Sequence, residues 1–145
     1  MSELKGQCMC GAVSFTAPRE TDEFNTCHCQ MCRRWAGSAF KSISVPSDKL
    51  EVTGVTSVRT LRTSDWGERS FCGTCGSTLW YRLTDGPYVG GTNIALGLLD
   101  DTEGLHLKNE YFVDYKTSAD VLLEDRVQMT EADVLAIFAP TGQDD

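Results

Sequence analysis

The chain has 145 residues and lacks a long hydrophobic run; its longest apolar segments are residues 93–99 and 134–139. A membrane-spanning helix needs about 20 consecutive apolar residues, so we expect no membrane span. The first ten residues, MSELKGQCMC, also lack the apolar stretch of a secretory signal. We therefore predict a cytoplasmic protein.

Basic residues are in short supply, since 13 lysines and arginines stand against 21 aspartates and glutamates. The formal net charge is −8 and the sequence pI is about 4.7. Such a chain is repelled by phosphate backbones and anionic lipid, so we expect no nucleic-acid partner and no membrane partner. An anionic small ligand would need a local basic patch.

Histidine is scarce, but seven cysteines are present. In a reducing compartment, clustered cysteines indicate metal binding or catalysis more often than disulfides, and an odd number cannot all be paired. The seven form three groups: Cys8 and Cys10; Cys27, Cys29 and Cys32; Cys72 and Cys75.

Four of these cysteines match a closed zinc site. In an extended C-x-C segment both sulfurs lie on one face, and the glycines of CGTCG let the second pair curl around a metal. A tetrahedral zinc site made of four cysteines needs two such pairs. Pairing Cys8 and Cys10 with Cys72 and Cys75 would close a loop of more than sixty residues and contribute to folding.

The other three cysteines predict a different kind of site. Three protein ligands with one open position are typical of a catalytic or substrate-binding zinc. Arg33 and Arg34 directly follow Cys32, so they are candidates for an anion-binding spot, together with the amides of Gly37 and Ser38. The resulting prediction is two Zn2+ per chain, one structural and one catalytic.

Several alternatives stay open at this point. Cys72 and Cys75 would also fit a redox pair, and Cys8 and Cys10 would also fit two buried thiols without a metal. The three cysteines at 27, 29 and 32 would also fit part of an iron–sulfur site. The arginines would also fit solvated surface charges. The two histidines are weaker candidates: His28 points away from its cysteine neighbours in an extended segment, and His106 fits a structural role.

The residue pattern predicts a mainly β fold with one or two short helices, arranged as a barrel or as folded sheets. Strands are expected at residues 11–15, 40–45, 55–63, 69–71, 78–83, 88–89 and 93–99, and residues 105–115 are expected to be extended. A turn around residues 64–67 is expected to join two of these strands, 55–63 and 69–71, in a hairpin. Thr130 and Asp133 predict the start of a helix that ends before Pro140. We expect one zinc-binding catalytic domain over residues 1–140 and a frayed tail over 141–145.

Four segments, GQCMCGAVSF, CHCQMCRRWAGS, FCGTCGSTLW and GLLD, resemble in order and spacing the glutathione-dependent formaldehyde-activating enzyme family. The resemblance covers residues 6–106. It implies a β-tent of folded antiparallel sheets, a structural zinc on the four-cysteine set and a catalytic zinc on the three-cysteine set. Around His106 the chain departs from the family pattern, which often has a proline shortly before this histidine and then a tryptophan and a Leu-Pro pair. Here Gly104 and Leu105 precede His106, and Phe112 and Tyr115 follow it without such a pair.

The resemblance also implies an activity. Family members are assigned as carbon–sulfur lyases that join glutathione to formaldehyde, or run the reverse. We therefore expect a small thiol and a small aldehyde as ligands, with Asp65, Glu68, His28 or water as candidate proton donors and acceptors. The alternative hypothesis is a zinc-binding thiol carrier or protein-docking module without catalysis, and a homo-oligomer fits either hypothesis.

Overall fold

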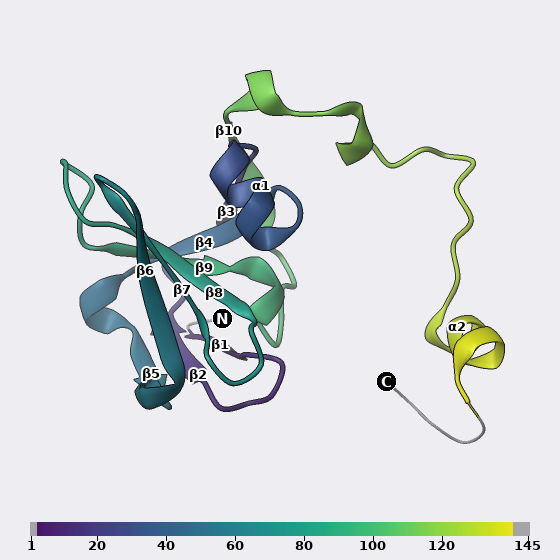
Figure 1. Cartoon of the computed structure of the whole chain (residues 1–145), viewed down its shortest axis with the longest axis horizontal. Coiled ribbons are helices and arrows are strands. Elements are labelled where there is room, and N and C mark those ends of the chain that lie inside the picture. The colour runs from purple at the N-terminus through teal and green to yellow at the C-terminus, as the bar shows by residue number, and fades with distance from the viewer. Residues whose placement is uncertain (1–2, 141–145) are drawn as a thin grey trace.

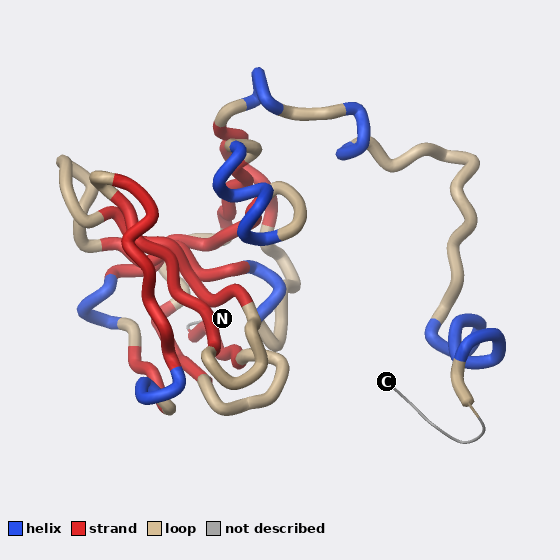
Figure 2. Tube along the Cα trace, in the orientation of Figure 1, coloured by secondary structure: helices blue, strands red, loops and turns tan. Residues whose placement is uncertain are grey.

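The computed structural model describes residues 3–140, which form ten strands, two α-helices and several single 3-10 turns (Figures 1 and 2). The strands make two sheets. The three-stranded sheet has the order β1-β2-β5 and the seven-stranded sheet the order β10-β3-β4-β9-β8-β7-β6. The strands are β1 Glu3–Gln7, β2 Ser14–Pro18, β3 Glu23–Cys27, β4 Phe40–Pro46, β5 Glu51–Thr53, β6 Val58–Ser64, β7 Gly67–Cys72, β8 Thr78–Leu83, β9 Gly91–Ala95 and β10 His106–Tyr111.

Alternation of side chains explains how the sheets face each other. Along β1 and β2 every second residue is buried, so that Leu4, Phe15 and Ala17 point into the core. The seven-stranded sheet contributes Ile43, Leu79, Trp80 and Ile94 to the same core. The Phe15 and Trp80 rings meet edge-on, with centroids 6.1 Å apart. Burying each large apolar side chain stabilises the fold by about 1.5–3 kcal/mol.

Two glycines allow the backbone of distant segments to approach closely. A Cβ at Gly6 would clash with the Leu98 carbonyl oxygen, and one at Gly54 would clash with the Ala12 carbonyl oxygen. Gly54 also has φ 87°, a left-handed conformation that disfavours other residues. The first contact brings β1 against the 3-10 turn at Leu96–Leu98, and the second brings Ala12 against the end of β5.

The mainly β prediction with short helices is confirmed, and the described residues form two sheets, not a closed barrel. The hairpin expected around residues 64–67 joins β6 to β7. The structure differs from an antiparallel arrangement at one edge, because β10 pairs parallel to β3. The long connection between these two strands permits parallel pairing.

Five strand predictions are wrong in detail. The strand expected over 11–15 begins only at Ser14, and the one expected over 55–63 begins at Val58, after a 3-10 turn at Val55–Ser57. Residues 88–89 lie in an exposed turn, because Gly86 and Gly90 with φ 101° and 112° bend the chain on both sides of them. The strand expected over 93–99 ends at Ala95 and continues as a 3-10 turn at Leu96–Leu98. The extended segment expected over 105–115 ends at Tyr111 and is followed by a 3-10 turn at Val113–Tyr115.

Helix α1, Gln30–Ala36, carries part of the three-cysteine site. Cys29 is its N-cap and accepts a hydrogen bond from the Cys32 N–H at 3.3 Å. Gly37, with φ 83°, ends the helix, and its N–H donates to the Arg33 carbonyl oxygen. The helix therefore begins at one cysteine and places another in its first turn.

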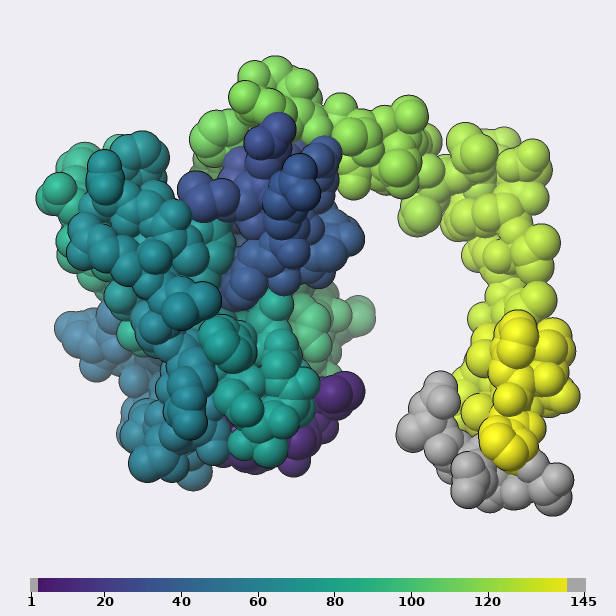
Figure 3. Space-filling view, in the orientation of Figure 1, coloured from purple at the N-terminus to yellow at the C-terminus, as the bar shows by residue number. Residues whose placement is uncertain are grey.

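Residues 112–140 form an arm that extends away from the two sheets (Figures 1 and 3). Its helix α2, Glu131–Phe138, has the predicted cap, in which Thr130 Oγ1 accepts from the Asp133 N–H and the Asp133 carboxylate from the Thr130 N–H. Ile137 and Phe138 are exposed. A single domain over 1–140 stays a prediction, and the expected tail at 141–145 lies outside the described residues. No helix in the described part of the chain is long and apolar enough to cross a membrane.

Candidate functional site

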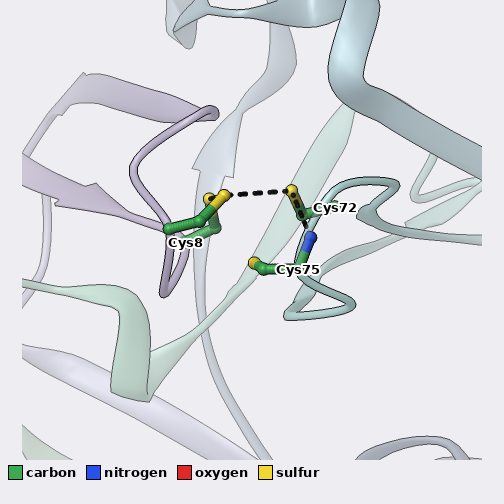
Figure 4. A group of neighbouring side chains, drawn as sticks. Cys8, Cys72 and Cys75 are labelled. Atoms are coloured by element: carbon green, nitrogen blue, oxygen red, sulfur yellow. Dashed lines mark hydrogen bonds between the residues drawn. The ribbon is translucent and has the colours of Figure 1, made fainter.

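The four-cysteine site joins the β1–β2 turn to the β7–β8 turn. The ligand atoms of Cys8, Cys10, Cys72 and Cys75 all lie within 4.8 Å of one another, and three of these side chains are seen pointing toward one another in Figure 4. The Cys8–Cys10 and Cys10–Cys72 sulfur distances are 3.6 and 3.9 Å. Two sulfurs on a tetrahedral zinc lie about 3.8 Å apart, whereas a disulfide needs about 2.05 Å. The sulfur–sulfur distances therefore fit a site for one metal ion and not a disulfide.

Backbone amides around this site are oriented toward the sulfurs. The N–H groups of Val13 and Cys75 donate to the sulfurs of Cys8 and Cys72 at 3.3 and 3.4 Å. The Ala12 N–H donates to the Cys10 sulfur at 3.5 Å. Such bonds stabilise metal-binding thiolates. This group of four cysteines could hold a metal ion.

The three-cysteine site forms where β3 meets α1. Cys27 ends β3, Cys29 caps α1, and Cys32 lies in its first turn. Their three sulfurs lie within 4.8 Å of one another, and Cys32 is buried. This group could also hold a metal ion, so the division of seven cysteines into four and three is reproduced in space.

The thiols in each cluster oppose one another's ionisation. A hydrogen bond from Cys32 lowers the pKa of Cys27, while the same contact, followed by burial, raises the pKa of Cys32. In the four-cysteine site, hydrogen bonds from the Ser77 side chain and backbone lower the pKa of Cys75 to about 5. Crowded sulfurs cannot all become thiolates unless a cation compensates their charge. The donor sets therefore fit a soft divalent cation such as zinc.

Arg69 on β7 lies beside the three-cysteine site and was not among the residues expected from the sequence. The side chain is buried, and its Nη2 donates to the Cys32 sulfur at 3.4 Å. Its Nη1 donates to the Thr63 hydroxyl, and its guanidinium lies over the Tyr81 ring at 4.7 Å. Arg69 is two positions after Gly67 on the same strand, so side-chain alternation puts both residues on the buried face of the sheet. A charged residue at such a buried position is the feature of the sequence that could have indicated a role for Arg69.

A cavity of about 410 Å³ opens beside Arg69, between α1 and strands β6 to β8. Arg34 lines it, whereas Arg33, Gly37 and Ser38 are not part of its wall. The Gly37 N–H is occupied by the helix cap, and the Ser38 hydroxyl donates to the Ala39 carbonyl oxygen. Substrate binding by these four residues stays a prediction, and Arg34 is the one that the geometry favours.

His28 lies between two of the site's cysteines but contacts residues of β10 and of the arm. It is buried, and its Nε2 lies 3.0 Å from the Glu110 carboxylate on β10, while Nδ1 lies 3.7 Å from the Asp120 carboxylate of the arm. The His28 N–H also donates to the Tyr111 carbonyl oxygen at 2.9 Å. His28 therefore ties the segment between Cys27 and Cys29 to the C-terminal part of the chain. His106 is exposed and lies 3.8 Å from Glu23.

Comparison with known proteins identifies the family. The family model described as "Glutathione-dependent formaldehyde-activating enzyme" matches residues 3–115. The chain belongs to this family. The matched residues contain both cysteine sites, Arg34 and Arg69, and end within the arm.

Two curated relatives show how far the sequence likeness extends. A Schizosaccharomyces pombe protein named an uncharacterized lyase is 37% identical over 90 residues, 61% of this chain and 65% of its own length. A Halomonas elongata protein, whose name contains the words glutathione-dependent formaldehyde-activating enzyme, is 34% identical over 93 residues, 53% of this chain and 54% of its own. The chain thus covers less than two thirds of either relative.

A solved structure shares the fold of this family member. The crystal structure of a Rhodobacter sphaeroides protein superposes with a TM-score of 0.58 at 20% identity, over 73% of this chain and 98% of that protein. At this identity the likeness supports the fold alone.

Proposed function

We propose that the chain is a zinc-dependent carbon–sulfur lyase. It forms or cleaves a hemithioacetal between a small thiol, such as glutathione, and formaldehyde or another small aldehyde. The observation that carries the proposal is a three-sulfur cluster beside a cavity that two arginines line. The family description and the names of the two relatives support a lyase and this pair of ligands.

The two cysteine sites have different roles in this proposal. Cys8, Cys10, Cys72 and Cys75 would hold a structural zinc, and Cys27, Cys29 and Cys32 a catalytic one. Zinc prefers four ligands, so a three-cysteine set leaves one position for water or the thiol of the substrate. When bound there, zinc lowers the pKa of a thiol and holds the thiolate.

The reaction needs one new bond and one proton. The thiol loses its proton, its sulfur bonds to the aldehyde carbon, and the carbonyl π pair moves to oxygen, which accepts a proton. Asp65, Glu68 and His28 are not among the residues that line the cavity, so we assign the proton steps to water. The chain's own contribution is to hold the thiol: Arg69 keeps the Cys32 sulfur in place, and Arg34 offers a positive charge at the cavity wall.

Exchange between formaldehyde and glutathione tests the proposal. The zinc-loaded protein should accelerate formation of S-hydroxymethylglutathione over the uncatalysed rate. Cys27→Ser should remove that acceleration and lower the zinc content from about two to about one per chain. Ser44→Ala, which replaces an exposed residue of β4, is the control variant and should keep both the zinc content and the acceleration.

Two outcomes would contradict parts of the proposal. Zinc content near one per chain that Cys27→Ser leaves unchanged would eliminate the catalytic site. Thiol binding without acceleration would favour the alternative, a zinc-binding thiol carrier. A cytoplasmic location and a homo-oligomer stay predictions.

A further inference from the structure

Helix α2 carries apolar side chains that the described part of the chain does not bury. Six of its eight residues are apolar, and the other two are Glu131 and Asp133. Ile137 and Phe138 are 58% and 73% exposed, and no residue of the helix is buried. A helix that is apolar on most sides is normally covered by other parts of a protein or by a partner. The composition of α2 therefore indicates a helix that packs against a further surface.

The length of α2 leads to the same conclusion. An isolated helix of fewer than about 12–15 residues is marginal in water, and α2 has eight. Among the described residues, the ion pairs between the arm and the sheets end at Asp120, which lies 3.7 Å from His28. The hydrogen bonds of residues 121–140 all lie within the arm. Packing from outside the arm would therefore stabilise the helix.

Strand β6 has a surface that complements α2. It is the outer strand of the seven-stranded sheet, and it contains two arginines and no carboxylate. Side-chain alternation places Arg59 and Leu61 on the same face, and both residues are exposed. Within the part of the chain that the structure describes, no ion pair involves Arg59. This face can give α2 an apolar contact and a positive charge opposite Glu131.

The two complementary surfaces are far apart within one chain. Figure 1 shows β6 and α2 on opposite sides of the two sheets. In two copies related by a twofold axis, α2 of each chain can pack on β6 of the other, and such a pair is closed. Because one chain carries both surfaces, a second copy of the chain fits α2 better than an unrelated protein does.

We propose that two copies of the chain exchange their arms, so that α2 of each copy docks on the face of β6 that carries Arg59 and Leu61 in the other copy. Leu61 also lines the cavity beside the three-cysteine site, so the docked helix would lie at the rim of that cavity. The proposal does not depend on which ligand the cavity binds.

Sedimentation equilibrium of the zinc-loaded full chain tests the role of α2. The parent should form a species of twice the 16.0 kDa chain mass. Phe138→Ser should raise the dissociation constant at least about tenfold, because a buried aromatic side chain is a typical anchor of an interface. Leu122→Ser is the matched control, because Leu122 is an exposed apolar residue of the arm outside α2, and it should leave the dissociation constant unchanged.

A second pair of variants tests the face of β6. Arg59→Gln should raise the dissociation constant about fivefold to tenfold through loss of a charge-assisted contact. Arg62→Gln is its control and should have little effect, because Arg62 lies on the opposite face of the same strand. Each arginine donates to a nearby backbone carbonyl, Arg59 to that of Thr56 and Arg62 to that of Asp65, so both changes cost a similar local contact.

Three results would overturn the proposal. The first is a parent chain that stays monomeric throughout the concentration series. The second is an equal response to Phe138→Ser and Leu122→Ser, which would remove α2 from the interface. The third is an equal response to Arg59→Gln and Arg62→Gln, which would remove this face of β6 from it.

Hydrogen exchange gives an independent measurement on the unaltered chain. The amides of Glu131–Phe138 should become more protected as the protein concentration rises, because the helix is stabilised only in the dimer. Protection that does not depend on concentration would show that α2 is stable within a single chain, and it would contradict exchange of the arms.

Discussion

Replacing Cys10 with serine tests whether the four-cysteine site cross-links the chain. Cys10 is exposed, so the substitution creates no cavity in the core. Its sulfur nevertheless lies 3.6 Å from that of Cys8 and 3.9 Å from that of Cys72. Any large loss of stability must therefore come through the bound metal and not through packing.

The expected magnitude follows from the length of chain that the site closes. Cys10 and Cys72 are 62 residues apart in sequence, and a cross-link over such a loop is worth about 4 kcal/mol in the chain-entropy treatment. Cys27 and Cys32 are five residues apart, which corresponds to about 2 kcal/mol. Both values are large against the 5–15 kcal/mol that is typical for a whole domain.

Urea unfolding with and without a zinc chelator measures the effect. In zinc that saturates the parent sites but not the weakened variant sites, Cys10→Ser should lower the free energy of unfolding by up to about 4 kcal/mol, and Cys29→Ser by up to about 2 kcal/mol. The full values are reached when the remaining cysteines of the site hold no metal. Cys29→Ser is a suitable comparison, because serine retains the helix-capping function of that residue. In chelator, the parent and Cys10→Ser should unfold alike, since neither holds the cross-link.

Two results would refute this reasoning. Equal losses for Cys10→Ser and Cys29→Ser in zinc would show that loop length does not govern the effect. A difference between the parent and Cys10→Ser that persists in chelator would show that Cys10 stabilises the chain without a metal.

Three further predictions concern the fold. Gly54→Ala should lower the free energy of unfolding by about 3 kcal/mol, because Gly54 has a positive φ and a Cβ there would clash with the Ala12 carbonyl. Gly97 has open space around it, so Gly97→Ala should change the free energy of unfolding by less than about 1 kcal/mol. Thermal unfolding measures both variants. Leu79→Ala should cost about 2–5 kcal/mol because its side chain is fully buried, and Leu122→Ala on the exposed arm should have almost no effect in the same urea titration. Hydrogen bonds from His28 and Lys116 lower the pKa of Glu110, so their stabilisation of β10 is present above the ordinary carboxyl pKa of 4.5 and is lost as the pH falls below it toward the lowered value. Hydrogen-exchange protection of His106–Tyr111 should fall across that range in the parent and much less in Glu110→Gln, and equal pH dependence in both would contradict the assignment.

Local features of the fold could be predicted from the sequence because they depend on neighbouring residues. The Thr130 cap, the β6–β7 hairpin and strand β4 follow from hydrogen bonds and side-chain alternation within a few residues. The strand predicted at residues 88–89 was wrong for a related reason. The glycines around it could turn the chain, and apolar character alone does not distinguish a short strand from an exposed turn.

The grouping of the cysteines was also accessible from the sequence. Thiols with the C-x-C and C-x2-C spacings converge locally, and the count of seven requires an unequal division between two sites. Chemistry that is carried by spacing within one segment does not need the complete fold to be recognised.

Only the tertiary structure decided what surrounds the three-cysteine site. Arg69 reaches Cys32 across 37 positions of sequence, and Glu110 reaches His28 across 82, through strands β7 and β10. These contacts depend on which strands pair and in which register, and β10 pairs parallel to β3 through a long connection. Because a shift of one residue in such a pairing turns every side chain to the opposite face, no local pattern could specify them. The sequence by itself determined which cysteines group together, and the packing of distant strands determined the charges and the cavity beside them.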